Sequence, residues 1–164
     1  MRRLLIATTN PSKFSEAKGV FENEDVEILG LKDFPQVKQV QETGDTFLDN
    51  AILKVKGYFE QIGIPCIADD GGLAVDYLGG LPGVHSHRWV EAIGFDGKFS
   101  EPYGTRASVK NFPGFRRGGE TGMMPTDHEL ANTVLKKLDG VPQEKRTARL
   151  GGFMVFWNGE NLLK

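Results

Sequence analysis

The feature that most constrains this fold is the alternation, near the N-terminus, of short apolar runs with a helical pattern. Residues 4–7 form one run suited to a buried strand, and residues 26–29 form another. Between them, Asn10 is a favoured helix N-cap, and Pro11 suits the first helical position because its missing N–H would have no partner there. Apolar residues recur at helical spacing over residues 14–21. The chain therefore opens as a β-α-β unit of an α/β protein.

A second helix is predicted over residues 46–62. Its apolar residues form one stripe, and Asn50 is among the polar residues outside that stripe. The apolar run 64–68 then leads into Asp69 and Asp70 and a pair of glycines, which predicts a strand that ends in a glycine turn. Ligands of open α/β sheets bind beyond the carboxyl ends of strands, so this turn is a favourable position for chemistry.

The last third of the chain adds a helix and a strand. Thr126 is followed three residues later by Glu129, which is a capping box, and the helix is predicted to continue to Gly140. Residues 147–157 are typical of a strand. With no repeats and no separable linker, the 164 residues are expected to form a single domain, 1–164.

Two segments depart from this regular pattern. Residues 94–125 are rich in glycine, proline and aromatic residues without any period, which predicts an insertion loop. Asn158-Gly159 is a strong hairpin signal, yet only residues 160–164 follow it. So short a return strand would leave the preceding strand with an unpaired edge. We therefore expect the chain to be incomplete at its C-terminal side, as a fragment, a frameshifted product or a naturally shortened variant.

Composition excludes several kinds of partner. The net charge of −2 predicts no strong attraction to nucleic acid or to acidic membranes, and no apolar stretch is long enough for a membrane span. The pair Arg116-Arg117 is a weak nucleic-acid signal. The one cysteine, Cys66, cannot form an internal disulfide and is most simply a buried thiol, which favours a cytoplasmic protein.

The turn between the first strand and the first helix is a candidate phosphate site. A helix N-terminus with two hydroxyls, an amide and a lysine offers the groups that bind phosphate. The residues of this turn are Thr8, Thr9, Asn10, Pro11, Ser12 and Lys13. The alternative interpretation is a capped helix with a solvated Lys13.

The second candidate consists of carboxylates and a lysine. Mg²⁺ takes oxygen ligands, typically one or two carboxylates with substrate phosphates and water, and Asp70 and Glu42 are candidates. Adjacent strand residues point to opposite faces, so only one of Asp69 and Asp70 is expected to face a given site. Lys54 is placed to reach a phosphate. The alternatives are an aspartate pair that shapes a turn and a solvated helical lysine.

Other polar residues carry weaker signals. His85 and His87 alternate after a glycine-rich turn, but no third ligand completes a zinc site. Taken together, a helix-start phosphate cradle, a lysine and carboxylates at a strand end indicate metal-assisted chemistry on a phosphate ester.

Several motifs in register resemble those of the inosine triphosphate pyrophosphatase family, which hydrolyses dITP, ITP and XTP. The resemblance covers about residues 1–93 and 126–164. The motifs are Ala7–Lys13, Glu42–Phe47, Asn50–Lys54, Ile67–Asp76, Leu78–Val84 and Val141–Arg149.

This resemblance implies a fold, a reaction and roles for individual residues. The fold is α/β, with a long mixed central sheet, flanking helices and two lobes around a cleft, in a homodimer. The reaction is Mg²⁺-dependent hydrolysis of a purine nucleoside triphosphate to the monophosphate and pyrophosphate. By matching motif, the turn 8–13 and Gly71 contact substrate, Lys54 neutralises phosphate charge, Glu42 and Asp70 bind metal, and Asp70 also activates water.

Three departures from the family pattern accompany the resemblance. Gly71 stands where the family usually has serine, and residues 94–125 are longer than the family's connection. The family also continues beyond this chain, with Gly-Phe-Gly-Tyr-Asp and Ser-His-Arg stretches that grip the base; we treat the Ser-His-Arg of residues 86–88 as coincidental. The alternative function is therefore a catalytically weak or inactive nucleotide-binding relative.

Overall fold

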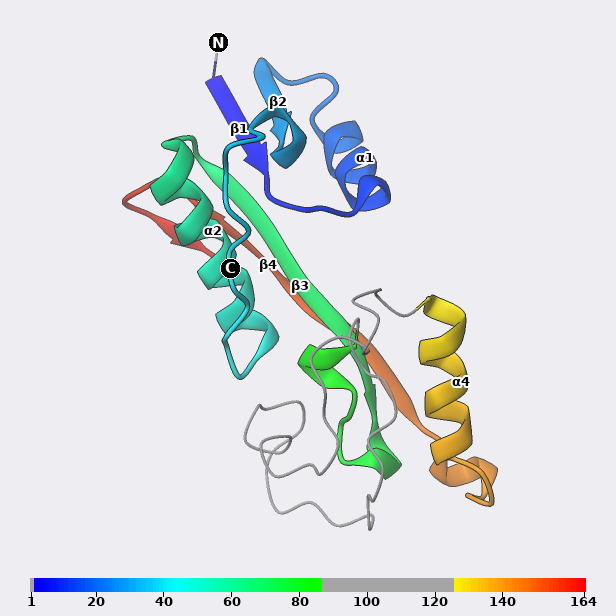
Figure 1. The fold of residues 1–164 in the computed structure, drawn as a ribbon. Coiled ribbons are helices and arrows are strands. Elements are labelled where there is room, and N and C mark those ends of the chain that lie inside the picture. Colours follow the sequence, from blue (N-terminus) through cyan, green and yellow to red (C-terminus); the bar gives the residue numbers. More distant parts are fainter. Residues whose placement is uncertain (1, 87–125) are drawn as a thin grey trace. The chain divides into compact units, whose positions relative to one another are not determined.

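The computed structural model describes residues 2–86 and 126–164, apart from the side chains of His85 and Asp127. The insertion predicted at 94–125 lies outside these residues. Within the described residues, five strands form one sheet in the order β2-β1-β3-β4-β5 (Figure 1). The strands are β1 (Arg2–Ile6), β2 (Val26–Gly30), β3 (Cys66–Val75), β4 (Ala148–Trp157) and β5 (Leu162–Leu163). The helices are α1 (Pro11–Val20), α2 (Phe47–Ile62) and α4 (Asp127–Lys137), with short 3₁₀ turns at Leu31–Asp33, Asp76–Leu78, Gly83–His85 and Gln143–Lys145.

The sheet is mixed. Strand β1 pairs in parallel with β2 and with β3, whereas β4 and β5 are antiparallel. The predicted α/β fold with a mixed sheet and flanking helices is therefore confirmed.

The chain forms two compact units, in agreement with the two lobes expected from the resemblance. Unit 1 consists of Met1–Gly44, Leu48–Asp70 and Phe153–Lys164, and unit 2 of Asp45–Phe47 and Gly71–Gly152. Strands β3 and β4 each contribute residues to both units. That residues 1–164 act as a single domain stays a prediction.

The opening β-α-β unit forms as predicted. Asn10 caps α1, and its side-chain oxygen accepts hydrogen bonds from the backbone N–H groups of Ser12 and Lys13, which would otherwise lack partners. Leu4, Leu5 and Ile6 are all buried. Since successive strand residues point to opposite faces, both faces of β1 are covered.

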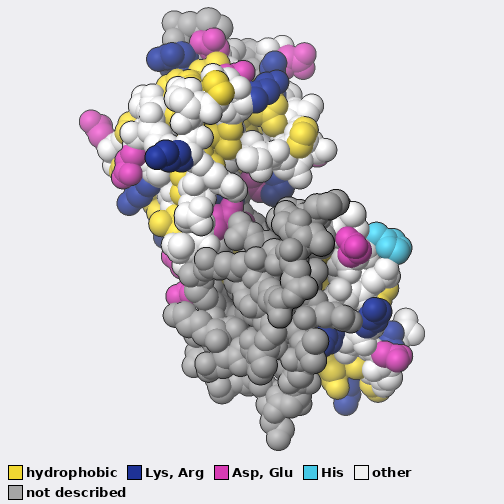
Figure 2. Space-filling model, viewed as in Figure 1, with side chains coloured by type: hydrophobic (Ala, Val, Ile, Leu, Met, Phe, Trp, Pro, Cys, Tyr) yellow, Lys and Arg dark blue, Asp and Glu magenta, His cyan; other side chains and the backbone are white. Residues whose placement is uncertain are grey.

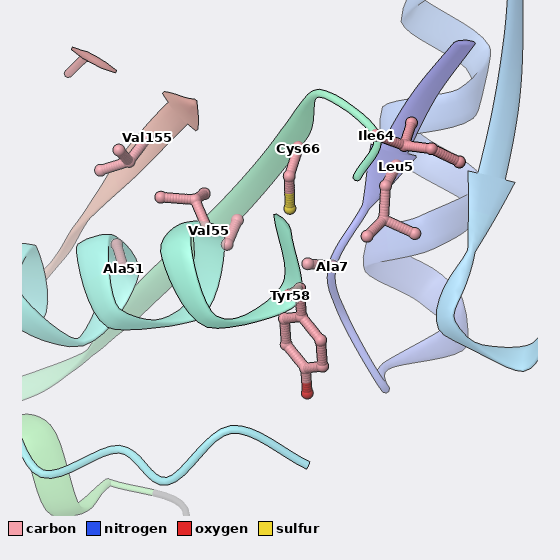
Figure 3. Close-up of a cluster of buried hydrophobic side chains, with 9 residues drawn as sticks. Leu5, Ala7, Ala51, Val55, Tyr58, Ile64, Cys66 and Val155 are labelled. Carbon is pink, nitrogen blue, oxygen red and sulfur yellow. The ribbon is translucent and has the colours of Figure 1, made fainter. Parts of the chain in front are cut away.

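Helix α2 packs its apolar stripe onto the sheet of unit 1. Ala51, Val55 and Tyr58 on α2 lie against Leu5 of β1 and Cys66 of β3, as Figure 3 shows. The full buried cluster is Leu5, Ala7, Ala51, Val55, Tyr58, Ile64, Cys66, Ala68 and Val155. Each fully buried aliphatic side chain contributes roughly 1.5–3 kcal/mol to folding, so this cluster fixes the position of α2 on the sheet.

The predicted glycine turn after Asp70 is wrong. Strand β3 continues through Asp69, Asp70, Gly71 and Gly72 to Val75 without a break. The two glycines are explained by close neighbours instead of by a turn. A Cβ on Gly71 would lie 2.8 Å from the carbonyl oxygen of Gly151, and a Cβ on Gly72 would collide with Ser86.

The described residues of unit 2 form a core of their own. It is built from Val75, Leu78, Leu81, Leu138 and Val141. The predicted capping box of α4 is present, since Thr126 accepts from the backbone N–H of Glu129 and the Glu129 carboxylate accepts from Thr126.

The predicted hairpin at the end of the chain is also present, in unit 1. Strand β4 turns back through Asn158–Asn161 into β5. The Asn158 side-chain oxygen accepts from the backbone N–H groups of Glu160 and Asn161, and Gly159 has a φ of +98°, a conformation that glycine adopts without strain.

On the described surface, charges of both signs are interspersed (Figure 2). This mixture agrees with the small net charge of −2. Within residues 2–86 and 126–164, no helix combines the length and the apolar character that crossing a bilayer requires.

The thiol of Cys66 is predicted to be unreactive in the folded protein. Burial raises its pKa to about 12, so almost no thiolate forms near neutral pH. At pH 8 we expect a thiol-specific disulfide reagent to label the protein in guanidinium completely and the native protein only at the slow rate of unfolding. The pKa of Cys66 is higher in the folded than in the unfolded protein. Its contribution to the free energy of unfolding is therefore complete below the unfolded pKa and is lost as the pH rises toward 12. Equal labelling rates in both states would contradict this prediction.

Candidate functional site

The turn from residue 8 to residue 13 joins β1 to α1 and is held by its own side chains. The Thr8 hydroxyl oxygen accepts from the Asn10 N–H at 3.1 Å. The Asn10 side chain accepts from the Ser12 N–H at 2.9 Å and the Lys13 N–H at 3.3 Å. The capped helix is therefore present, and the phosphate-binding role of these residues stays a prediction.

The alternative interpretation predicts a solvated Lys13, but Lys13 has an ion-pair partner. Its ammonium group lies 2.5 Å from Oδ2 of Asp69, and the two side chains are 39% and 29% exposed. Ile6, the last residue of β1, pairs with Ile67 of β3, so Asp69 lies just beyond the carboxyl end of β1, beside the turn. The structure therefore joins the predicted phosphate turn to the aspartate pair.

A second cluster surrounds Lys54. Its Nζ lies 3.5 Å from Oε1 of Glu42 and 3.6 Å from Oδ1 of Asp70. The Lys54 side chain is only 13% exposed and that of Asp70 12%, so the interpretation of Lys54 as a solvated lysine is wrong. As expected for neighbouring strand residues, Asp69 and Asp70 have different partners.

Glu42 reaches this cluster because residues 38–44, here called the strap, are bound along one face of α2. At one end, the Gln61 side chain accepts from the N–H of Lys38 and donates to its carbonyl oxygen. At the other end, Asn50 Oδ1 accepts from the Gly44 N–H at 2.8 Å. The strap therefore runs antiparallel to α2, and Figure 1 shows this cyan segment beside the helix.

The middle of the strap is held by two further residues of α2. Val40 donates its N–H to the Tyr58 hydroxyl at 3.5 Å. A Cβ on Gly57 would lie 2.8 Å from Val40 Cγ2, so glycine permits this close approach. Burial raises the pKa of Tyr58, and the negative charge of Glu42 adds to that rise, so the hydroxyl keeps its proton.

Asn50 is the site residue that our sequence analysis missed. The apolar stripe predicts Asn50 on the polar side of the second helix, but its exposed fraction is only 2%. Its Nδ2 donates to Asp70 Oδ2 at 3.0 Å. The signal that could have revealed it is its spacing, because residues four apart lie on the same helix face and Asn50 is four residues before Lys54.

Gly71, predicted to contact substrate, belongs to unit 2 and lies against the backbone of Gly151 and Gly152. Ser86, the first residue of the Ser-His-Arg sequence, has a structural partner in the same unit: its hydroxyl accepts from the Leu73 N–H and donates to the Gly83 carbonyl oxygen. Nothing in these contacts tests a substrate contact at Gly71.

The histidines and arginines named above do not add to the described site. His87, Arg88, Arg116 and Arg117 lie outside the described residues, as does the side chain of His85. Within residues 2–86 and 126–164, no three acidic, histidine or cysteine side chains gather closely enough to hold a metal by themselves. That Glu42 and Asp70 bind a metal stays a prediction.

This arrangement defines a class of protein before any comparison. A capped helix N-terminus follows a parallel strand, and two lysines and three carboxylates lie beside it. That combination is typical of α/β proteins that bind phosphate esters.

The chain belongs to the Ham1 family, whose model matches residues 4–101. It is 37% identical over 149 residues to a dITP/XTP pyrophosphatase of Geobacillus kaustophilus and 46% identical over 149 residues to one of Bacillus anthracis. Each alignment covers 91% of this chain and 58% of the relative. These matches confirm the family resemblance seen in the sequence.

The fold is also similar to a solved structure. The crystal structure of a nucleoside-triphosphatase, or dITP/XTP pyrophosphatase, from Mycobacterium abscessus matches with a TM-score of 0.68 and 29% identity. The match covers 98% of this chain and 69% of that one. The chain thus spans somewhat more than half the length of the curated relatives named above.

Replacing Gly71 by serine, the residue usual in the family, is predicted to destabilise this chain. The new Cβ would lie 2.8 Å from a backbone oxygen and 3.1 Å from Gly152 Cα, so β4 must shift. We expect a loss of roughly 1–3 kcal/mol in the free energy of unfolding, measured in urea. The control is Gly151→Ala, whose Cβ meets nothing within 4 Å. Wild-type stability of Gly71→Ser would contradict the prediction.

Proposed function

We propose that the protein hydrolyses non-standard purine nucleoside triphosphates (dITP, ITP and XTP) to the monophosphate and pyrophosphate. The observation that carries this proposal is the convergence of Glu42 and Asp70 on Lys54, beside a second lysine-carboxylate pair. The named activity of the relatives, dITP/XTP pyrophosphatase, supports the same reaction.

The charges of the cluster favour a metal-bound triphosphate. Glu42 and Asp70 present two carboxyl groups to the ammonium group of Lys54. Carboxylates repel the negatively charged phosphates of a nucleotide, and a divalent cation bound between the two offsets that repulsion. Two carboxylates with substrate phosphates and water are a donor set that Mg²⁺ accepts, so the residues present fit this ion.

The proposed mechanism assigns a task to each residue of the site, and two tasks to Asp70. The turn 8–13 offers N–H groups and the Lys13 ammonium to the phosphates. Lys54 neutralises phosphate charge, and the Asp70 carboxylate accepts a proton from the attacking water. The water oxygen bonds to phosphorus, the bond between the α- and β-phosphates breaks, and pyrophosphate leaves. When bound, Mg²⁺ supplies charge neutralisation at the phosphates, with Glu42 and Asp70 as its protein ligands.

Assembly and location are part of the same proposal. We infer a cytoplasmic homodimer that binds no nucleic acid and no membrane. The buried free thiol of Cys66 supports a reducing compartment. Light scattering of the purified protein measures the assembly state, and a monomeric mass at micromolar concentration would refute the dimer.

Asp70→Asn is predicted to abolish pyrophosphate release. The amide is nearly isosteric but cannot accept the proton, so we expect kcat to fall by about 10²–10⁴-fold. The assay measures pyrophosphate from dITP, XTP and dGTP with Mg²⁺, and circular dichroism checks the fold. The matched control is Glu60→Gln, which removes one negative charge from the exposed face of α2.

The same assay distinguishes the alternative function. Selective turnover of dITP or XTP by the wild-type chain supports the enzyme, and retained activity in Asp70→Asn removes Asp70 from the role of base. Nucleotide binding without turnover by the folded wild-type protein would instead identify a nucleotide-binding relative with weak or no catalysis.

Glu42→Gln is predicted to raise the Mg²⁺ requirement. Loss of one of two carboxylate ligands weakens a hard-cation site, so we expect the Mg²⁺ concentration for half-maximal rate to rise by about tenfold or more. Rates are measured over a Mg²⁺ titration at saturating nucleotide. An unchanged titration curve would exclude Glu42 as a ligand.

A further inference from the structure

Within the part of the chain that the structure describes, Asn50 is the only buried residue with a charged, amide, histidine, serine or threonine side chain. A buried amide costs folding free energy unless its polar atoms are hydrogen-bonded. Its neighbours on α2, Ala51 and Val55, are fully buried and apolar, so an apolar residue would suit this environment. The cost is offset by two hydrogen bonds, and both lead to the candidate site.

The two bonds join Asn50 to the two segments that carry the carboxylates. Its Oδ1 accepts from the N–H of Gly44, two residues after Glu42 on the strap, at 2.8 Å. Its Nδ2 donates to Oδ2 of Asp70 on β3 at 3.0 Å. The orientation of the amide is determined by these partners, because a backbone N–H can only donate and an ionised carboxylate can only accept.

Close packing at Gly44 reinforces the first bond. A Cβ on Gly44 would lie 2.8 Å from Asn50 Oδ1 and 2.9 Å from the Asn50 backbone nitrogen. Only glycine therefore lets the strap approach the first turn of α2 this closely. The end of the strap and the amide of Asn50 are held in one arrangement.

Lys54 and Asn50 act on different oxygens of Asp70 and in different ways. Lys54 Nζ lies 3.6 Å from Oδ1, a separation that provides charge but little direction. Asn50 lies within hydrogen-bond distance of Oδ2, and bonds to a charged acceptor are roughly twice as strong as neutral ones. Asn50 therefore supplies a directional hydrogen bond to the Asp70 carboxylate, which the longer Lys54 contact does not.

We propose that Asn50 is a positioning residue that sets the orientation of Asp70 and its separation from Glu42 in the reaction. This inference rests on the proposed function. Asn50 acts through Asp70 and the strap and does not itself contact substrate. Its loss is therefore expected to lower kcat and to leave the KM for nucleotide little changed.

Two variants separate its two bonds. Asn50→Asp keeps an oxygen that can accept from the Gly44 N–H, but it replaces the N–H donor to Asp70 by a carboxylate oxygen. Asn50→Ala removes both hydrogen bonds. The matched control is Val55→Ala on the same helix, which removes fully buried volume without touching the site. All proteins are assayed at a temperature where circular dichroism shows them folded.

We expect kcat to fall by about 10–100-fold in both Asn50 variants and to stay near wild type in Val55→Ala. Three-bond NMR couplings report the χ1 rotamer of Asp70: one rotamer in the wild type and Val55→Ala, and averaged rotamers in both Asn50 variants. Amide exchange at Gly44 is expected to accelerate in Asn50→Ala only.

Wild-type kcat and a single Asp70 rotamer in Asn50→Asp would overturn the inference, and so would an equal loss of kcat in Val55→Ala. A failure of the proposed function gives a different result from a failure of this inference. An inactive wild-type chain would refute the enzyme and with it a role for Asn50 in the reaction. The Asp70 rotamer, which needs no turnover, would still decide whether Asn50 holds that carboxylate.

Discussion

The packing of α2 against the sheet of unit 1 is the interaction on which the candidate site depends. Val55 is fully buried, and Ala51 and Tyr58 lie in the same cluster as Leu5 and Cys66. A helix held by this apolar stripe cannot rotate without exposing it to water. The directions of the polar residues that flank the stripe are therefore fixed along with it, and two of them, Asn50 and Lys54, meet Asp70 on the neighbouring strand.

A second consequence of this packing is the course of the strap. The chain from residue 38 to residue 44 has no regular secondary structure, so its backbone groups need partners outside itself. Gln61, Tyr58 and Asn50 supply three of those partners from one face of α2. Helix α2 thus organises both carboxylates: it holds the strap that bears Glu42 and contacts the strand that bears Asp70.

Unit 1 combines this site with the capped N-terminus of the first helix. Lys13 follows the cap of α1 and pairs with Asp69, while Lys54 lies between Glu42 and Asp70. Each lysine already has a carboxylate partner before any nucleotide is present. In the proposed function, an incoming phosphate would compete with these ion pairs, and a divalent cation bound to the carboxylates would free the lysines for the phosphates.

Local patterns in the sequence were sufficient for most of the secondary structure. The cap at Asn10, the stripe of the second helix, the capping box at Thr126 and the hairpin at Asn158 depend on residues close together in the chain, and all are present. The glycine turn predicted after Asp70 failed because glycines occur both in turns and where another backbone comes close, and the neighbour, Gly151, is remote in sequence.

The sequence by itself determined the β-α-β opening, the amphipathic helix α2 and the family, because these follow from short-range periodicity and from motifs in register. Only the tertiary structure decided that Lys13 and Lys54 are paired and that Asn50 is buried between two segments of the site. The physical reason is that burial and ion pairing depend on which distant residues are brought together. In this chain the packing of α2 on the sheet brings those residues together.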